Sequence, residues 1–257
     1  MELHAVFRAC RSLSKSYRRS KSKWAAGIDQ EVSGWDSWLK GEGMAWADSR
    51  ADYQRRLDPN AGLGDWLNAL MDHLSDNPLK ILDLGSGPLT SLGKTHPTKR
   101  LEIIATDPLA PHYDRLLEKY KLTPPVRTIA VAAESLTSKF ATNTFHLATA
   151  FNCLDHAIDP VEAIRQTVSV VKPSCRLLMV HYENEGQNEN YTGLHQWNFT
   201  IQGGDFIISN GHSSTNVTRV LGSSASVRAF RDNGSFWGDP SQNKFIIVII
   251  RKHTAAA

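Results

Sequence analysis

Long apolar runs and cysteines are both scarce in this sequence. Its longest continuous apolar run, 245–250, is far shorter than the roughly 20 residues that a helix needs to cross a bilayer. The N-terminus also lacks the apolar run, about 7 to 15 residues long, of a secretory signal. The three cysteines are odd in number and widely separated, at Cys10, Cys153 and Cys175, and this usage favours a reducing compartment. We therefore expect a cytoplasmic protein without a membrane span.

Acidic residues are nearly missing from the start of the chain, where Glu2 is the single one before residue 24. Basic residues are frequent in the same segment: Arg8, Arg11, Lys15, Arg18, Arg19, Lys21 and Lys23. We treat residues 1–26 as a basic leader. Such a segment fits peripheral contact with an anionic membrane, contact with nucleic acid, a transit peptide, or a solvated and partly disordered tail.

The remainder has the composition of a folded protein, because 41% of the chain is apolar and 21% is charged. Residues 27–59 carry Trp35, Trp38 and Trp46, and we expect a helical cap there. Apolar residues then recur at helical spacing between Leu63 and Leu74, which predicts an amphipathic helix. We interpret residues 60–257 as one domain to which the cap and the leader are attached.

Strand-like runs alternate with helical segments along this domain. The expected strands cover 80–84, 101–106, 126–131, 145–151 and 176–181, and the expected helices cover 111–121 and 160–171. Apolar strands that alternate with helices are typical of a parallel sheet covered on both faces. Two further β-like runs, 217–230 and 244–251, predict a closing antiparallel hairpin. The expected fold is α/β: a doubly wound, seven-stranded, mostly parallel sheet with an antiparallel terminal strand and an N-terminal helical cap.

The sharpest motif is Asp83-Leu84-Gly85-Ser86-Gly87, in which a strand runs directly into a Gly-x-Gly turn. Glycines at the carboxyl end of a first strand let the backbone turn tightly and approach a ligand closely. A Walker loop places four residues between its glycines, whereas residues 88–92 separate Gly87 from Gly93. A dinucleotide loop requires a third glycine at position 90, where Thr90 stands. Both phosphate-binding interpretations are therefore disfavoured.

The motif resembles the first motif of class I S-adenosylmethionine-dependent methyltransferases. The resemblance implies that Asp83 lies near the methionine end of the cofactor and that Gly85 and Gly87 form the cofactor-binding turn. Leu89 stands where this family usually has its third glycine, so the loop departs from the commonest form.

Later strand ends agree with this resemblance. Asp107 follows the second expected strand, about 20 residues after the glycines, where a carboxylate can accept hydrogen bonds from both ribose hydroxyls. Ala133 and Glu134 lie in a segment similar to the family's Asp-Ala-Glu near the adenine, although Ala132 replaces the Asp. Asn152 lies in a segment that resembles the fourth motif, and the resemblance assigns it to the cofactor too. The resemblance spans roughly 60–182 and implies a Rossmann-like enzyme that uses S-adenosylmethionine.

Methyl transfer to a hydroxyl is an in-line displacement that gains from a positioned general base. His156 and His181 stand at the ends of the fourth and fifth expected strands, and His195 follows in the long polar stretch 181–199. Histidine titrates near neutral pH, so we expect the base among these three and favour His181, with Glu183 to orient its ring. A metal site of His181, Glu183 and His195 matches no strong spacing motif, so no residue is assigned as a metal ligand.

The segment after the fourth strand also bears on the acceptor. Enzymes that methylate base amines typically carry Asn/Asp-Pro-Pro-Tyr/Phe there, whereas residues 152–155 read Asn-Cys-Leu-Asp, and no Pro-Cys nucleophile occurs in the chain. These departures argue against nucleic acid, and we expect O-methylation of a small-molecule, sugar or lipid-linked acceptor. The alternative is a non-catalytic methyltransferase-like partner in an assembly, which the altered positions Leu89, Ala132 and Ser174 support. Nothing in the sequence indicates the oligomeric state.

Overall fold

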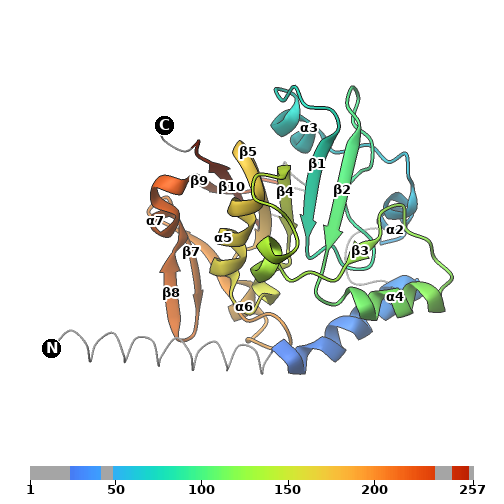
Figure 1. Ribbon diagram of the computed structural model, residues 1–257. Coiled ribbons are helices and arrows are strands. Elements are labelled where there is room, and N and C mark those ends of the chain that lie inside the picture. Colours follow the sequence, from blue (N-terminus) through green and yellow to red (C-terminus); the bar gives the residue numbers. More distant parts are fainter. Residues whose placement is uncertain (1–23, 42–48, 235–244, 255–257) are drawn as a thin grey trace.

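The computed structural model describes residues 24–41, 49–234 and 245–254, and its centre is a seven-stranded sheet (Figure 1). The strands of this sheet are β1 (Leu79–Leu84), β2 (Leu101–Thr106), β3 (Thr128–Ile129), β4 (Phe145–Phe151), β5 (Val171–Tyr182), β9 (Ala225–Arg231) and β10 (Phe245–Lys252). They lie in the order β3-β2-β1-β4-β5-β10-β9, and β10 runs antiparallel to both of its neighbours. The other neighbouring pairs are parallel. The expected doubly wound sheet with an antiparallel terminal strand is confirmed.

Helices flank this sheet. They are α2 (Ser49–Leu57), α3 (Asp65–Met71), α4 (Ala110–Lys119), α5 (Pro160–Val170), α6 (Glu185–Asn188), α7 (Val217–Leu221), and the 3-10 helices η1 (Ala133–Ser138), η2 (Leu154–His156) and η3 (Gly222–Ser224). Helix α5 shows why they form where they do: the Asp159 side chain accepts a hydrogen bond from the Glu162 backbone N–H, and Pro160 occupies the first turn. Its apolar face, with Ile164 and Val168, is buried.

The central strands are apolar on both sides because helices cover both faces of the sheet. In β1, Leu79 and Ile81 belong to one apolar cluster, whereas Leu82 and Leu84 belong to another. This alternation follows from the two-residue repeat of a strand. Full burial of one such side chain contributes roughly 1.5–3 kcal/mol, so the two clusters fix the register that places the strand ends side by side.

Two strand predictions after residue 170 are wrong. Strand β5 begins at Val171 rather than at 176, because the chain stays extended through a register irregularity in which Ser174 adopts a positive φ of 64°. The run 217–230 is not one strand, since α7 and η3 precede β9. The Asn216 side chain accepts a hydrogen bond from the Arg219 backbone N–H and so caps α7, which a pattern of β-branched residues did not reveal.

Residues 198–216 form a second, three-stranded antiparallel sheet that the sequence analysis did not predict. Its strands are β6 (Asn198–Gln202), β7 (Asp205–Asn210) and β8 (Ser213–Asn216), in that order. Phe199, Phe206 and Ile208 pack into the main core from this sheet. The small sheet therefore anchors the long polar stretch that precedes it.

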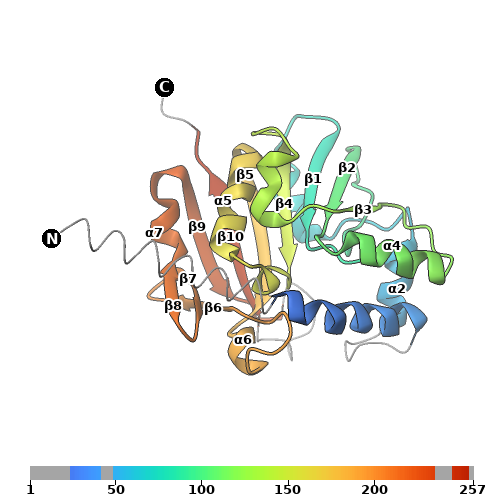
Figure 2. The same ribbon diagram turned by 60° about the horizontal axis from the view of Figure 1, so that its bottom comes forward.

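The connection from β1 to β2, residues 85–100, contains no helix. The helix over residues 24–40 and α2 lie near this connection instead, at the carboxyl ends of the strands beside α4 (Figure 2). These helices form the N-terminal cap that the sequence predicts. Most of the basic leader, residues 1–23, and Trp46 lie outside the described residues.

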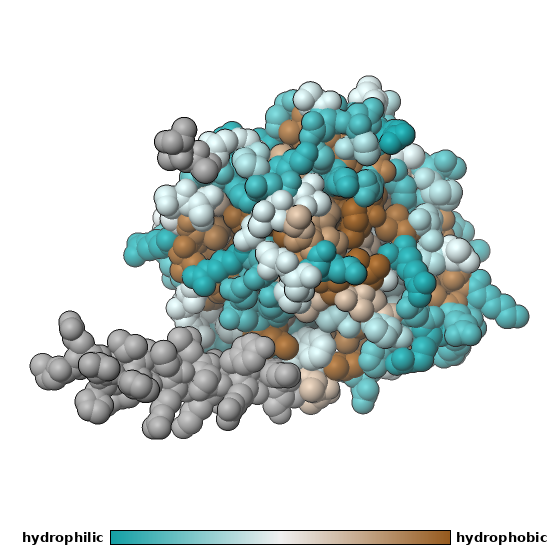
Figure 3. All heavy atoms as spheres, in the orientation of Figure 1, coloured by the Kyte–Doolittle hydropathy of each residue, from teal (hydrophilic) through white to brown (hydrophobic). Residues whose placement is uncertain are grey.

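The described surface is mainly polar, with separate apolar areas on the face seen in Figure 3. Val220, which is 39% exposed, is the one large apolar residue of the described chain that counts as exposed. No helix in the described ranges has the length and apolar character needed to cross a membrane.

Candidate cofactor and acceptor site

Asp83 lies at the carboxyl end of β1 and is almost completely buried. Its two carboxylate oxygens accept hydrogen bonds from the hydroxyls of Thr90, at 2.6 Å, and Thr149, at 2.8 Å. Burial raises the pKa of the Asp83 carboxyl, although both hydrogen bonds oppose this effect. Asp83 therefore joins the loop after β1 to the neighbouring strand β4.

The Gly-x-Gly turn adopts a conformation that favours glycine. Gly85 and Gly87 have φ angles of +56° and +63°, in the left-handed region. A Cβ on Gly85 would lie 2.3 Å from the Cβ of Cys153, and one on Gly87 would lie 2.6 Å from the ring of Trp35. The backbone thus approaches β4 on one side and the cap on the other more closely than any side chain allows.

Asp107 follows β2 and lies directly beside this turn. Its Oδ2 accepts a hydrogen bond from the Gly87 backbone N–H at 3.2 Å, and its Oδ1 accepts one from the Leu109 backbone N–H at 2.8 Å. Burial raises the pKa of this carboxyl to about 7, and the negative charges of Glu31 and Asp83 add to the effect. The sequence-predicted positions Asp83, Gly85, Gly87 and Asp107 are thus brought together at one edge.

The remaining predicted cofactor residues lie further along this edge. Ala133 and Glu134 begin η1, and Glu134 Oε1 accepts hydrogen bonds from the backbone N–H groups of Ile158 and Asp159, at 2.8 and 3.2 Å. Asn152 ends the β4 segment with a positive φ of 47°. Its amide nitrogen donates to Glu185 at 3.0 Å, and its amide oxygen accepts from the Tyr182 backbone at 3.2 Å. In this structure Asn152 therefore links β4 to β5 and α6.

The cap contacts the loop that follows β1 and contains the Gly-x-Gly turn. Trp35 and Trp38 pack with Leu89 in one buried apolar cluster. The Arg56 guanidinium lies 5.8 and 5.2 Å from the centres of these two rings and donates to the Leu89 carbonyl at 2.9 Å. Arg55 donates to the Ser91 carbonyl at 2.8 Å. The loop is therefore fixed by the cap, and the Trp35 ring covers Gly87.

A second polar group gathers where β4 and β5 end. His195 Nδ1 lies 2.8 Å from Asp155 Oδ2 and 3.0 Å from His156 Nε2. His156 Nε2 is 3.4 Å from the same carboxylate oxygen. On the other side, His181 Nδ1 is 4.0 Å from Asp155 Oδ1. All three histidines predicted as candidate bases thus surround one buried carboxylate, Asp155.

Backbone contacts bring the polar stretch after β5 to this carboxylate. The Gln196 backbone N–H donates to the Asp155 carbonyl at 3.1 Å, and the Trp197 indole donates to the Ala157 carbonyl at 2.9 Å. These two contacts place His195 next to η2. From α6, Glu185 Oε1 comes within 3.6 Å of His195 Nδ1.

The electrostatics of this group depend on burial and on Asp155. Burial lowers the pKa of His181 to about 4, so its ring is neutral near pH 7. Burial also disfavours the charged form of His195, but the hydrogen bond and charge of Asp155 outweigh it and raise the pKa to about 9. Burial raises the pKa of Glu185, with the Asp155 charge adding to it. For Asp155 itself, the three histidines outweigh burial and lower the pKa.

Sequence reasoning gives no role to two members of this group. Asp155 enters the sequence analysis only as the last residue of the segment 152–155, and Glu185 only as part of the long polar stretch 181–199. The acidic residue beside a histidine at a strand end was the available signal for Asp155. The expected support of His181 by Glu183 is absent, because Glu183 forms an ion pair with Arg231 at 2.6 Å and accepts from Thr200 at 2.7 Å.

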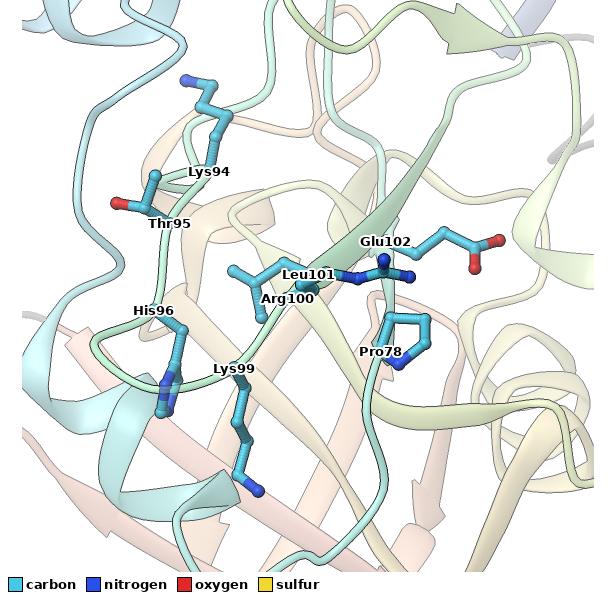
Figure 4. A pocket seen from close by; sticks show the side chains of 8 residues that line it. All are labelled: Pro78, Lys94, Thr95, His96, Lys99, Arg100, Leu101 and Glu102. Atoms are coloured by element: carbon cyan, nitrogen blue, oxygen red, sulfur yellow. The ribbon is translucent and has the colours of Figure 1, made fainter.

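A surface hollow of about 600 Å³ lies at the opposite end of the sheet, near the starts of β1 and β2 (Figure 4). Lys94 and Lys99 line it, but their side chains point away from each other (Figure 4). Lys94 Nζ donates to the backbone carbonyls of Arg55 and Arg56, at 3.2 and 2.9 Å. Lys94, which directly follows Gly93, therefore contacts the cap.

Comparisons with known proteins show what the chain is similar to. The sequence model of a family described as a methyltransferase domain matches residues 82–179. No curated protein sequence matches the chain.

Solved structures share the fold at low identity. A chain from the Haloferax volcanii complex that contains the Trm112 methyltransferase activator has 12% identity and a TM-score of 0.52, with 89% of this chain and 98% of that chain covered. The plantazolicin methyltransferase BpumL, solved with S-adenosylhomocysteine (SAH), has 10% identity and a TM-score of 0.52, with 97% and 100% covered. The CMeT domain of the citrinin polyketide synthase has 18% identity and a TM-score of 0.51, with 74% and 51% covered.

Proposed function

We propose that this chain is a class I S-adenosylmethionine-dependent methyltransferase that methylates a hydroxyl of a small-molecule, sugar or lipid-linked acceptor. Its residues 82–179 match the model of a methyltransferase domain. The observation that carries the proposal is the pair of groups at one edge of the sheet. The glycine turn with Asp83 and Asp107 lies at the ends of β1 and β2, and the histidines around Asp155 lie at the ends of β4 and β5. Open α/β sheets bind their ligands at this edge.

For the cofactor, the left-handed glycines supply a turn that a ligand can approach without meeting a Cβ. We assign the ribose hydroxyls to Asp107, the methionine end to Asp83, and the adenine side to Ala133 and Glu134. Asn152 positions the end of β4 between the assigned cofactor residues and the histidines around Asp155. Since the Trp35 ring lies against Gly87, the cap must shift when the cofactor binds.

For the acceptor, bound S-adenosylmethionine supplies the methyl group, and the chain positions the hydroxyl and removes its proton. His181 is the best-placed base, because both of its ring nitrogens are buried without a hydrogen-bond partner among the described residues. Asp155 Oδ1 faces this ring and stabilises the positive charge that it gains. His156 and His195, in contrast, are already engaged with each other and with Asp155.

Two measurements test the proposal. Calorimetry should show binding of S-adenosylmethionine and SAH, and none of NAD or ATP. Incubation of the full chain with S-adenosylmethionine and a panel of phenols, sugars and lipid-linked alcohols should release SAH with at least one acceptor. Binding of NAD or ATP without either S-adenosyl compound would contradict the methyltransferase function.

The non-catalytic alternative has one observation in its favour. Both carboxylate oxygens of Asp83 and of Asp107 already have partners within the chain, and Trp35 covers the glycine turn. A non-catalytic scaffold could use these internal contacts for stability and would not need a cofactor. Failure of both S-adenosyl compounds to bind, in the full chain and in a Trp35→Ala variant that uncovers the turn, would favour this alternative.

We also propose a cytoplasmic location and no nucleic-acid substrate. Cys153 and Cys175 are unpaired, which supports a reducing compartment. Contact of the basic leader with an anionic membrane stays part of the proposal and is testable by co-sedimentation with phosphatidylserine vesicles.

A further inference from the structure

Three side-chain atoms converge on one point at the carboxyl end of β4: Asp155 Oδ2, His156 Nε2 and His195 Nδ1. Their mutual distances are 2.8, 3.0 and 3.4 Å. Ligands that each lie about 2.0–2.1 Å from one metal ion at a tetrahedral angle are about 3.3 Å apart. The triangle therefore has the size of one face of a metal coordination shell, slightly contracted.

Hydrogen bonding does not explain this convergence well. Each imidazole nitrogen carries at most one proton, and a protonated nitrogen cannot accept. If both His156 Nε2 and His195 Nδ1 point a proton at Asp155, two N–H groups face each other across 3.0 Å. If only one of them is protonated, it must share a single proton between a carboxylate and the other ring. A cation at the centre satisfies all three atoms at once.

Unpartnered polar atoms surround the same point. Asp155 Oδ1, both ring nitrogens of His181 and Glu185 Oε2 have no hydrogen-bond partner among the described residues. These residues are only 1, 1 and 7% exposed, so bulk water does not readily replace the missing partners. Buried polar atoms without partners are uncommon in folded proteins, and a missing ion is one of the usual reasons.

We propose that Asp155, His156 and His195 bind a divalent first-row transition metal ion. This set replaces the combination of His181, Glu183 and His195 considered from the sequence, since Glu183 is paired with Arg231. Two imidazoles and one carboxylate are the ligands of catalytic zinc and of non-haem iron sites, whereas magnesium prefers oxygen ligands and water.

The surroundings supply the supports that such ions usually have. Glu185 Oε1, 3.6 Å from His195 Nδ1, is close enough to become a fourth ligand after a small shift. Glu31 Oε2 is 3.9 Å from the other ring nitrogen of His156, where a carboxylate can orient a metal-bound imidazole. Glu31 belongs to the cap helix that carries Trp35, so the cap contacts both the cofactor turn and the metal site.

The role of the ion rests on the function proposed above. When bound, a divalent ion would lower the pKa of an acceptor hydroxyl and hold its oxygen in place. His181 is not in the ligand triangle and faces the other oxygen of Asp155. His156 and His195 then act as ligands and not as bases.

Metal binding is measurable without any acceptor. We expect the full-length protein, stripped with a chelator, to bind one Zn²⁺ per chain by calorimetry, and Co²⁺ to give the visible absorption of a nitrogen- and oxygen-ligated ion. His156→Ala and His195→Ala should each weaken Zn²⁺ binding at least 100-fold. Millimolar Mg²⁺ should not compete. His146→Gln is the matched control, because His146 also lies 2.6 Å from an aspartate but has no second histidine beside it.

The proposal fails if Zn²⁺ and Co²⁺ do not bind at 1 mM, or if both histidine variants bind as tightly as the wild type and the control. Because His156 and His195 are partly exposed, their replacement should leave the far-ultraviolet circular dichroism spectrum unchanged, and this measurement guards against misfolding. SAH binding is measured on the same samples. Metal binding without SAH binding would refute the methyltransferase function alone, and SAH binding without metal binding would refute the metal site alone.

Discussion

The two ends of strand β4 each carry histidine and aspartate, but they differ in how completely these groups are satisfied. At the amino end, His146 Nδ1 accepts from the Lys80 backbone at 2.9 Å, and His146 Nε2 lies 2.6 Å from Asp76. Lys172 donates to the same Asp76 oxygen at 2.7 Å. The Asp76 side chain is 52% exposed, so it remains accessible to solvent. Every member has a partner, and the arrangement needs nothing else.

At the carboxyl end, an aspartate and histidines also meet, but the aspartate is buried and fewer of the polar atoms have partners. Asp155 is buried, and one of its oxygens has no partner among the described residues. Protein segments that serve stability alone rarely keep such atoms. The comparison therefore separates a structural ion-pair group from a group that is arranged for a ligand or a reaction, although both contain histidine next to aspartate.

The strongest test of this difference is to remove one histidine from each end. We expect His181→Ala to lower kcat by roughly 10² to 10⁴, since a general base contributes about that factor, and to leave SAH affinity nearly unchanged. His146→Gln should leave both quantities unchanged. Steady-state kinetics with the acceptor found in the panel, together with calorimetry, measure both. Wild-type kcat in His181→Ala would show that transfer depends on positioning alone.

Glycines at the two ends provide the next comparison. Gly85→Ala places a Cβ 2.3 Å from the Cβ of Cys153 in a left-handed conformation, so we expect SAH affinity to fall at least 100-fold and thermal stability to decrease. Gly64→Ala, before α3, meets no atom within 4 Å and has a φ of −64°. It should behave like the wild type. Equal SAH affinities in the two variants would show that the turn does not approach the cofactor.

Aspartates at the two ends have pKa values shifted in opposite directions. Asp107 has its pKa raised to about 7, so its ionised fraction rises as the pH passes through the neutral range. If its carboxylate accepts both ribose hydroxyls, Asp107→Asn should weaken SAH binding about 5- to 150-fold, or about 1–3 kcal/mol. Wild-type affinity should rise between pH 6 and 8, and the variant should not show this rise. Calorimetry at the two pH values measures it, and a pH-independent ratio between the proteins would contradict the assignment.

The same shift predicts a cost in stability. The folded-state pKa of Asp107 lies above its unfolded value of 3.8, so the stability from its protonated form is present below pH 3.8 and is lost as the pH rises through about 7. The free energy of unfolding of the wild type should therefore decline relative to Asp107→Asn across this window. Urea unfolding at pH 5 and 8 gives the difference, and an unchanged difference would show that Asp107 is not buried in solution.

Much of the cofactor group, at the ends of β1 and β2, could be predicted because it depends on local sequence. Gly85, Gly87 and Asp107 directly follow apolar strands, and parallel strands bring their carboxyl ends to one edge whatever the rest of the chain does. The group of histidines around Asp155, at the same edge, could not be assembled in this way. His195 reaches His156 because the Gln196 backbone and the Trp197 indole hydrogen-bond to carbonyls of residues 155 and 157, and no periodicity encodes these contacts.

The same reason explains the errors in the fold. Residues 198–216 have short apolar runs that pack on the main core, so their strand pairing depends on a neighbour that is distant in sequence. The sequence indicates only that Trp35 belongs to the expected cap, and the folded chain shows that its ring meets Gly87. Local patterns placed the strands, whereas tertiary contacts decided which side chains meet.

The smallest effect is expected at the amino end, from Asp76→Asn. The hydrogen bonds from Lys172 and His146 lower the Asp76 pKa to about 2, below the unfolded value of 3.8. Its contribution to stability is therefore present above pH 3.8 and is lost as the pH falls through about 2. Since the Asp76 side chain is about half exposed, solvent screening keeps this contribution small, and the variant should unfold at nearly the wild-type temperature at pH 7. The two proteins should become indistinguishable toward pH 2.

Turnover and Zn²⁺ affinity should not change at all in Asp76→Asn. A large loss of turnover or of Zn²⁺ affinity in Asp76→Asn would contradict the distinction between the two ends of β4. It would show that the Asp76 group at the amino end also serves the site.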